Sequence, residues 1–189
     1  LGGFHLICDA TNTHAVAELR KRKQRPKKPF AVMFHDIHTL SSSAEISQKE
    51  HALITSKEKP IVIVPKAPHS MISDLVAPGI DRIGVFLPYT PLHTLLAQEA
   101  GVPLVATSAN LSDEPIIKNS SELLEKLGSV IDLVLDHDRD IVNANDDSVL
   151  QVASSENITL RMSRGYAPKS IKLPFKSNKN ILAVGANQK

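Results

Sequence analysis

Apolar residues recur along this chain in short runs, and many of the runs are separated by stretches with helical periodicity. Runs of about five residues rich in Val, Ile, Leu and Phe are typical of buried strands. They predict strands at 4–8, 30–34, 60–64, 82–87, 103–107, 132–135, 148–153 and 158–162. Capping residues followed by apolar residues three or four positions apart predict helices at 13–23, 41–55, 92–100 and 120–128.

The order of these elements predicts an α/β fold, because strands and helices interleave along most of the chain. The last two predicted strands flank Ser154-Ser155-Glu156-Asn157, a polar turn that is typical of an antiparallel hairpin. We therefore expect a twisted sheet of mixed parallel and antiparallel strands, with helices packed on its faces. The polar, Lys-containing stretch from about residue 174 is predicted to be a linker, and 181–185 to be the first strand of a following domain.

Composition narrows the class of protein. The chain has 189 residues, 42% of them hydrophobic and 22% charged, which fits one globular domain with a short extension. Aromatic residues make up 4% and Trp is absent, so the stacking platforms that hold single-stranded nucleic acid are not evident. Cys8 is the only cysteine, which favours a reducing cytoplasm. No apolar stretch approaches the roughly 20 residues of a membrane span, and no signal peptide is visible.

Positive charge is concentrated near the start of the chain. Residues 1–28 hold seven Lys and Arg against two acidic residues, a net charge of +5, whereas the whole chain carries +2. Such asymmetry favours an anionic ligand at a defined place. Within this region Lys23 and Arg25 would project to one side of an extended loop, offering a point charge and a bidentate fork to phosphate oxygens. The alternative is that the basic run is a solvated charged surface. For Lys23 and Arg25 a position in a cleft is favoured, because the helix must end before Pro26 and a strand follows just after it.

A second candidate lies at the end of the predicted strand 103–107. Thr107 is followed by Ser108-Ala109-Asn110, which places hydroxyl and amide groups at the carboxyl end of a strand, where open α/β sheets bind ligands. Ser108 and Asn110 are two residues apart, so their side chains share a face if the backbone is extended. Taken alone, the same residues favour a simple turn.

The sequence contains neither a P-loop nor a dinucleotide-binding glycine pattern, so side chains must hold any phosphate. Ser148 and Arg164 are further candidates for that role. Asp147, with the aspartate before it, fits either an Mg²⁺ ion accompanying a triphosphate or a turn at the start of the hairpin. No zinc site is expected, because the histidines lack metal-ligand spacing; they include His5, His35, His38, His93 and His137.

Together these elements resemble the YrdC family in order and approximate spacing: Lys23-x-Arg25, Thr107-Ser108-Ala109-Asn110, Asp147-Ser148-Val149 and Arg164-Gly165. Longer strings are similar to the YrdC-like domain of the HypF family of hydrogenase-maturation carbamoyltransferases. They are Leu1-Gly2-Gly3-Phe4-His5-Leu6, Cys8-Asp9-Ala10-Thr11-Asn12, Arg25-Pro26-Lys27-Lys28-Pro29-Phe30-Ala31-Val32-Met33, Leu87-Pro88-Tyr89-Thr90-Pro91-Leu92-His93, Asn110-Leu111-Ser112-Asp113-Glu114-Pro115 and Arg164-Gly165-Tyr166-Ala167-Pro168.

The resemblance implies a YrdC-like nucleotide-binding domain with a concave basic cleft over 1–173, its first strand lying upstream of this chain. Residues 174–189 would be a linker and the start of a Kae-type carbamoyl-transfer domain. The implied reaction joins carbamate, formed from carbamoyl phosphate by an acylphosphatase domain, to AMP with release of pyrophosphate. ATP and Mg²⁺ are then expected, with HypE as the later carbamoyl acceptor in NiFe hydrogenase maturation. The implied nucleotide-binding residues, the first two of them also catalytic, are Lys23, Arg25, Thr107, Ser108, Asn110, Ser148 and Arg164.

Two alternatives stay open. Threonylcarbamoyl-AMP synthases of the YrdC family, which serve tRNA modification, carry Pro-Thr-x-Thr-x-Tyr-Gly-Leu at the first strand, whereas this chain has Gly2-Gly3-Phe4-His5-Leu6. Loss of the Thr and Tyr residues disfavours a threonine pocket, and His5, Tyr89 and His93 are expected to close the site around the smaller carbamate. Each histidine could equally be structural. An RNA-binding module that uses the basic region is the second alternative.

Overall fold

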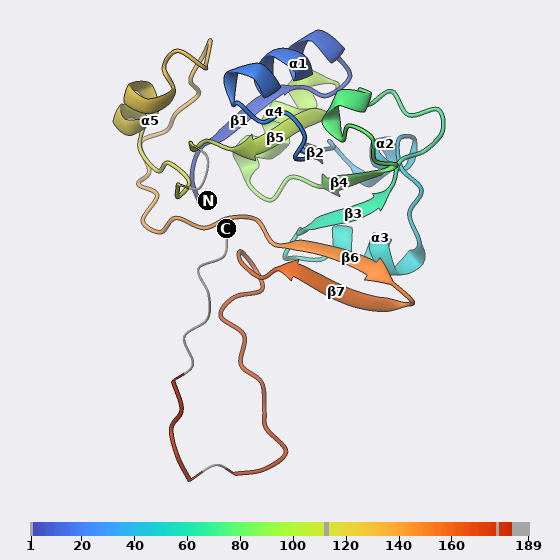
Figure 1. The fold of residues 1–189 in the computed structure, drawn as a ribbon, viewed down its shortest axis with the longest axis vertical. Helices are drawn as coiled ribbons and strands as arrows, with labels where there is room; N and C mark the ends of the chain where they lie inside the picture. The colour runs from blue at the N-terminus through green and yellow to red at the C-terminus, as the bar shows by residue number, and fades with distance from the viewer. Residues whose placement is uncertain (1, 112–113, 177, 183–189) are drawn as a thin grey trace.

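The structure is a computed structural model that describes residues 2–111, 114–176 and 178–182. A seven-stranded sheet runs through it in the order β1-β5-β2-β4-β3-β6-β7 (Figure 1). The pairs β2/β4 and β3/β6 are parallel and the other four neighbouring pairs are antiparallel, so the predicted mixed sheet is confirmed. The strands are β1 (His5–Asp9), β2 (Ala31–Met33), β3 (Ile61–Pro65), β4 (Arg82–Phe86), β5 (Leu104–Ser108), β6 (Val149–Ala153) and β7 (Glu156–Arg161).

Helices cover both faces of this sheet, because successive strand residues point to opposite sides. On β2, Val32 packs into the larger apolar core, whereas Met33 packs into a smaller cluster on the other face that includes Ala97 of α4. The larger core takes residues from α1, α3 and α5. The helical elements are α1 (Thr13–Arg22), α2 (Ile37–Ser41), α3 (Gln48–Ile54), the 3-10 turn η1 (Asp74–Val76), α4 (Pro91–Ala100) and α5 (Ser120–Leu127). Within the described part of the chain, none of the helices has the length and apolar character needed to cross a membrane.

The predicted helix over 41–55 is wrong in its first half. The chain instead ends α2 at Ser41, and Ala44 forms an isolated antiparallel bridge with Lys66. The helix α3 begins only after Ser47, whose hydroxyl accepts from the Glu50 amide while the Glu50 carboxylate accepts from the Ser47 amide. This capping box satisfies two otherwise unpaired amide groups, so it fixes the helix start at Ser47 rather than at the earlier serines.

The predicted strand at 132–135 is also wrong, since these described residues form no strand. Leu133 is 88% exposed, and Arg22 holds this segment through the Asp132 carboxylate and the Val130 carbonyl. An apolar run becomes a strand only where a neighbouring strand pairs with it. Residues 132–135 do not pair with the edge strand β1, which in the described sheet pairs only with β5. For the strand expected at 181–185, Ile181 and Leu182 have no regular structure and the rest lies outside the described residues.

Curvature brings the start of β1 close to the residues that precede β6. The Asn145 amide donates to the Gly2 carbonyl at 3.0 Å. A Cβ atom on Gly2 would lie 1.8 Å from the Asn145 carbonyl oxygen, so the backbones can approach this closely only because residue 2 is glycine. This contact brings the end of β5, which pairs with the start of β1, close to the start of β6, and most of the predicted site residues lie in this region.

Candidate anion-binding site

The loop after α1 carries Lys23 and Arg25, but it is not the extended loop that the sequence suggested. The Arg25 amide donates to the Arg20 carbonyl and the Gln24 amide to the Lys21 carbonyl, the two hydrogen bonds of a Schellman motif. Gln24 takes a left-handed φ of 50°, a position that usually belongs to glycine. This sharp reversal, rather than strand alternation, is what turns both basic side chains toward the end of β5.

Five predicted residues meet there, and we call them the Lys23 cluster: Lys23, Arg25, Thr107, Ser108 and Asn110. The Lys23 ammonium donates to the Ser108 carbonyl at 2.6 Å and to the backbone and side-chain oxygens of Asn110 at 3.1 and 3.0 Å. The Arg25 guanidinium donates to the Thr107 hydroxyl at 3.0 Å. The Ser108 hydroxyl donates to the Asn110 side-chain oxygen at 2.8 Å, so these two side chains do lie on the same side.

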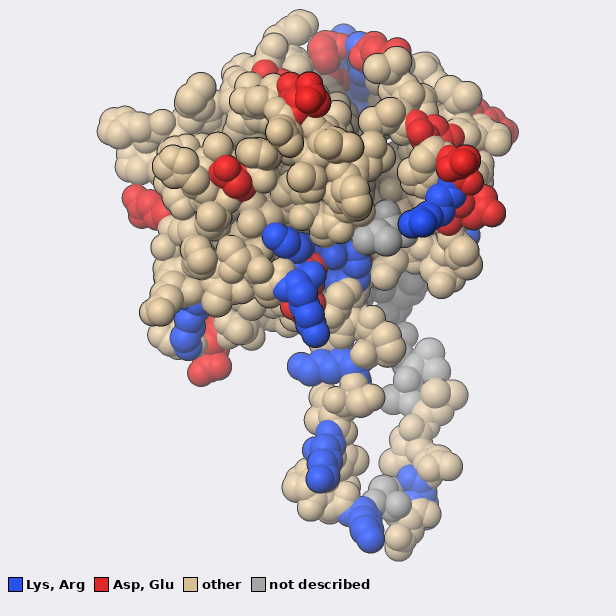
Figure 2. Space-filling model, turned by 180° about the vertical axis from the view of Figure 1, so that it is seen from behind, with Lys and Arg blue, Asp and Glu red and all other residues tan. Residues whose placement is uncertain are grey.

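The electrostatics of the Lys23 cluster favour an anion. In the described part of the chain neither Lys23 nor Arg25 forms an ion pair with a carboxylate. Burial, with the charges of Arg25 and Lys28, lowers the pKa of Lys23 to about 8, and burial, with the charges of Arg20 and Arg161, lowers that of Arg25 to about 10. Figure 2 shows Lys and Arg side chains gathered at the centre of the back face, just above the tail. A bound anion would relieve this repulsion.

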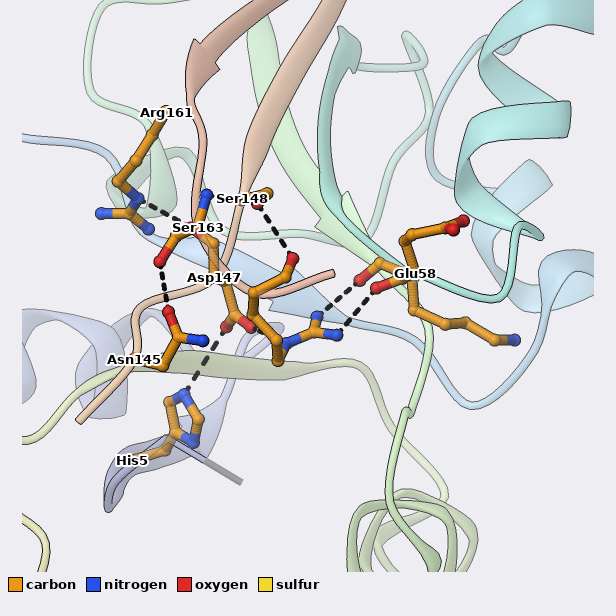
Figure 3. Close-up of polar contacts among 9 residues, drawn as sticks. His5, Glu58, Asn145, Asp147, Ser148, Arg161 and Ser163 are labelled. Atoms are coloured by element: carbon orange, nitrogen blue, oxygen red, sulfur yellow. Dashed lines mark hydrogen bonds and ion pairs between the residues drawn. The ribbon is translucent and has the colours of Figure 1, made fainter. Parts of the chain in front are cut away.

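The remaining predicted residues form a second group around a buried ion pair, which we call the Asp147 cluster: His5, Tyr89, His93, Asp147, Ser148 and Arg164. Figure 3 shows His5, Asp147 and Ser148 of this cluster. Arg164 Nε lies 2.8 Å from Asp147 Oδ1, and His5 Nε2 lies 3.6 Å from Asp147 Oδ2. Burial would raise the pKa of Asp147, but the hydrogen bonds and charges of His5 and Arg164 outweigh it and hold that pKa well below its usual range.

Ser148 and Arg164 are placed differently from the expectation that they hold phosphate. Ser148 is fully buried, and its hydroxyl accepts from the Ser163 amide at 2.8 Å and donates to the Arg164 carbonyl at 2.9 Å. The Arg164 guanidinium donates to the carbonyls of Glu58 and Lys59 at 2.7 and 2.8 Å. The two side chains therefore join the chain entering β6, the chain leaving β7 and the segment between α3 and β3, and we call this joined region the β6–β7 wall.

Three rings complete the Asp147 cluster. The Arg164 guanidinium lies 3.5 Å from the Tyr89 ring centroid, and the His93 ring meets those of Tyr89 and His5 edge to face at 4.7 and 5.7 Å. Burial lowers the pKa of His93 to about 4 and, with the Asp147 charge, raises that of Tyr89. His93 Nδ1 is buried with no hydrogen-bond partner in the described structure. A neutral His93 is also favoured by its place in the first turn of α4.

The β1/β5 ladder joins the two clusters. His5 pairs with Ser108 in the antiparallel register, and residues opposite each other in a ladder project on the same face. A cavity of about 1080 Å³ lies beside β1, lined by the Asp147-cluster rings His5, Tyr89 and His93 and by residues 130–142. It does not reach Lys23, Arg25 or Ser108. The three rings therefore line the cavity, whereas Lys23 and Arg25 do not.

Two functional candidates escaped prediction. Arg20 is 7% exposed and donates to the carbonyls of Leu75, Val76, Arg25 and Lys28, so it fastens the loop that carries Arg25. Its burial could have been predicted from the sequence, because Arg20 lies four positions after Val16 and so falls on the buried face of α1. Arg161 lies near enough to Arg25 to lower its pKa, and nothing in the sequence distinguishes it from other strand-end arginines.

The fold is that of an α/β domain with a mixed sheet, and its candidate anion site, the Lys23 cluster, is built from side chains and strand-end backbone without a P-loop. The chain belongs to the Sua5/YciO/YrdC family: the family model Sua5_yciO_yrdC, described as "Telomere recombination", matches residues 1–163.

Relatives and solved structures agree with this assignment. The carbamoyltransferase HypF of Synechocystis is 43% identical over 189 residues, which cover 100% of this chain and 25% of that protein. The threonylcarbamoyl-AMP synthase of Bacillus subtilis is 30% identical over 116 residues, covering 59% of this chain and 33% of that protein. A crystal structure of full-length HypF in a phosphate- and nucleotide-bound form superposes with a TM-score of 0.85 at 43% identity, covering 89% of this chain and 26% of that one. The chain thus spans about a quarter of the length of its HypF relatives.

Proposed function

We propose that this chain binds ATP and joins carbamate to AMP, releasing pyrophosphate, within a HypF-type carbamoyltransferase. The observation that carries the proposal is the pair of cations in the Lys23 cluster, which are held at a strand end by uncharged oxygens and pair with no carboxylate among the described residues. The similarity to a HypF protein crystallised with nucleotide and phosphate supports the choice of a nucleotide as the anion.

The proposed chemistry needs charge stabilisation and no protein nucleophile. An oxygen of carbamate attacks the α-phosphorus of ATP, a new P–O bond forms, and the bond from that phosphorus to the β-phosphate oxygen breaks. Negative charge builds on the departing pyrophosphate. Lys23 and Arg25, aided by the Ser108 hydroxyl and the Asn110 amide, are suited to stabilise it, and Thr107 keeps Arg25 aimed at the site.

The ring group of His5, Tyr89 and His93 is the proposed carbamate side of the site. The His93 ring meets the rings of His5 and Tyr89 edge to face, and all three rings line the cavity beside β1, where they could contact a small acyl group. Ser148 and Arg164, which the family pattern assigns to the nucleotide, would contribute by shaping the opposite wall.

Mg²⁺ fits this site as an ion that arrives with the triphosphate. The described residues contain no group of three His, Cys, Asp or Glu side chains able to hold a metal. Both oxygens of Asp147 already face Arg164 and His5. Since Mg²⁺ commonly binds through substrate phosphates and one or two carboxylates, it would supply charge neutralisation of those phosphates.

The wider role is proposed by similarity to whole HypF proteins. Carbamoyl phosphate would supply the carbamate through an acylphosphatase domain, and a Kae-type domain following residue 173 would pass the carbamoyl group to HypE for NiFe hydrogenase maturation. A single, partly buried cysteine, Cys8, suits a reducing cytoplasm.

The direct test is ATP–pyrophosphate exchange in the full-length protein with carbamoyl phosphate present. We expect exchange that depends on carbamoyl phosphate and falls by at least about 100-fold in Lys23→Ala and Asn110→Ala. Lys21→Ala removes an exposed neighbouring charge and is the matched control. Exchange at the wild-type rate in both site variants would show that the Lys23 cluster is not the nucleotide site.

Threonylcarbamoyl-AMP synthesis is the second candidate, favoured by the similarity to the Bacillus subtilis synthase. It predicts exchange that depends on threonine and bicarbonate rather than on carbamoyl phosphate. An RNA-binding module would instead show salt-dependent RNA binding that ATP does not displace. The same preparation of protein can therefore separate the three functions.

A further inference from the structure

Arg161 and Arg164 on the β6–β7 wall differ in how many of their guanidinium nitrogens already donate hydrogen bonds. Arg164 Nε pairs with Asp147, its two terminal nitrogens donate to the carbonyls of Glu58 and Lys59, and its planar face covers the Tyr89 ring. A guanidinium fixed on every edge and on one face cannot turn toward a phosphate without breaking a buried ion pair.

Only one nitrogen of the Arg161 guanidinium, Nε, forms a hydrogen bond among the described residues. Its Nε donates to the Asp147 carbonyl at 2.7 Å, and no other hydrogen bond or ion pair of this guanidinium occurs among the described residues (Figure 3). The side chain is exposed. Anchoring through Nε fixes the direction of the guanidinium while its two terminal nitrogens stay available, which is the fork that binds phosphate in a bidentate manner.

A β-bulge aims this side chain. Leu150 pairs with Thr159, so regular pairing would place Leu160 opposite Val149, but the register shifts and Arg161 takes that place. Bulges add one residue to a strand, redirect the side chains beyond it and are frequent beside active sites. Without the extra residue Arg161 would project to the other face of β7.

We propose that Arg161 is a third cation of the anion site, reaching the polyphosphate from the β7 wall opposite Lys23 and Arg25, while Arg164 holds that wall together. This proposal rests on the proposed nucleotide function. The charge of Arg161 already acts on Arg25 strongly enough to help lower its pKa, after burial and Arg20. All three nitrogens of Arg25 donate, to the carbonyls of Lys28 and Pro29 and to the Thr107 hydroxyl, but these acceptors are uncharged, so a polyphosphate can replace them without breaking an ion pair. Among the described residues neither Arg25 nor Arg161 pairs with a carboxylate, so the two guanidiniums can share one polyphosphate.

The test measures binding of inorganic pyrophosphate and of ATP to the full-length protein by calorimetry at fixed ionic strength, alongside the urea midpoint of unfolding. We expect Arg161→Gln to weaken pyrophosphate binding about 10- to 100-fold with a nearly unchanged midpoint, and Arg161→Lys to restore part of the loss. Arg164→Gln is expected to lower the midpoint. Lys21→Gln, which removes one exposed charge from α1, is the control for long-range electrostatics.

Pyrophosphate binding by Arg161→Gln as tight as that of the wild type and Lys21→Gln would overturn the role of Arg161 and leave the nucleotide function standing. So would a loss of binding in Arg164→Gln at an unchanged midpoint with Arg161→Gln unaffected. A wild-type protein that binds neither ATP nor pyrophosphate would overturn both proposals together.

Discussion

His5 Nε2 lies 3.6 Å from Asp147 Oδ2, although four strands of the sheet separate β1 from β6. The contact is possible because the sheet curves until the chain entering β1 meets the chain entering β6, where Asn145 also donates to Gly2. One carboxylate therefore ties the first strand, through His5, to the β6–β7 wall, through Arg164.

Removing the charge of Asp147 should destabilise the fold. Asp147→Asn leaves the guanidinium of Arg164 buried without its partner, so we expect the free energy of unfolding at pH 7 to fall by about 3 kcal/mol. Because the folded-state pKa of Asp147 is depressed, its stabilisation is present above the unfolded pKa of about 3.9 and is lost as the pH falls through the folded value.

Urea unfolding of the wild type and Asp147→Asn at pH 7 and pH 3 checks both statements. The variant should show the smaller loss of stability on acidification. Asp146→Asn, one residue earlier and less buried, is the matched control. An equal loss in the two variants at pH 7 would argue that the ion pair does not stabilise the sheet closure.

Lys23 should take up a proton when a polyphosphate binds. Burial and the charges of Arg25 and Lys28 lower its pKa to about 8, so roughly half of the Lys23 side chains are neutral at pH 8, and an adjacent anion favours the charged form. Calorimetry of ATP binding at pH 8 in buffers of different ionisation enthalpy should show net uptake of about half a proton. The uptake should vanish at pH 6 and in Lys23→Met; uptake that persists in Lys23→Met would assign it to another group.

Gln24→Gly should stabilise the protein. Gln24 has a φ of 50°, and the left-handed conformation costs a residue with a Cβ about 1 kcal/mol more than glycine. We expect the free energy of unfolding to rise by about 0.5–1 kcal/mol, measured by urea titration, with pyrophosphate binding retained. Gln24→Ala keeps the Cβ and is the control; a gain in Gln24→Ala equal to that in Gln24→Gly would exclude backbone strain as the cause.

Arg20→Met should weaken both the fold and the anion site. The variant keeps the apolar stem but removes the Arg20 donor from four backbone carbonyls, those of Leu75, Val76, Arg25 and Lys28. The Val76 carbonyl still accepts from the Phe30 amide and the Lys28 carbonyl from the Arg25 side chain, whereas those of Leu75 and Arg25 lose the Arg20 hydrogen bond without such a substitute among the described residues. We expect a loss of about 3 kcal/mol in the free energy of unfolding, and weaker ATP binding because the Arg25 loop loses its anchor. Lys21→Met, at the exposed neighbouring position, should change neither quantity appreciably, and similar losses in both variants would contradict the anchoring role.

The sequence pattern located most of the sheet. Runs such as 103–107 and 82–87 became β5 and β4 because their alternate residues fill the cores on the two faces. The pattern failed at residues 132–135, because an apolar run forms a strand only if another strand pairs with it. In the described structure these residues pair with no strand and line the cavity instead. Within 41–55, local capping by Ser47 and the Ala44–Lys66 bridge overrode helical propensity.

By itself the sequence determined the α/β class, a strand that ends at about Thr107 and the gathering of basic residues around the end of α1, because these depend on local periodicity and on charges close together in the chain. Only the tertiary structure decided which side chains are free to meet an anion. In the tertiary structure Arg164 binds Asp147 and the chain after α3, and Arg20 is buried among carbonyls. The two terminal nitrogens of Arg161 have no partner among the residues that the structure describes. These roles depend on sheet curvature and on a one-residue bulge, which join positions more than a hundred residues apart.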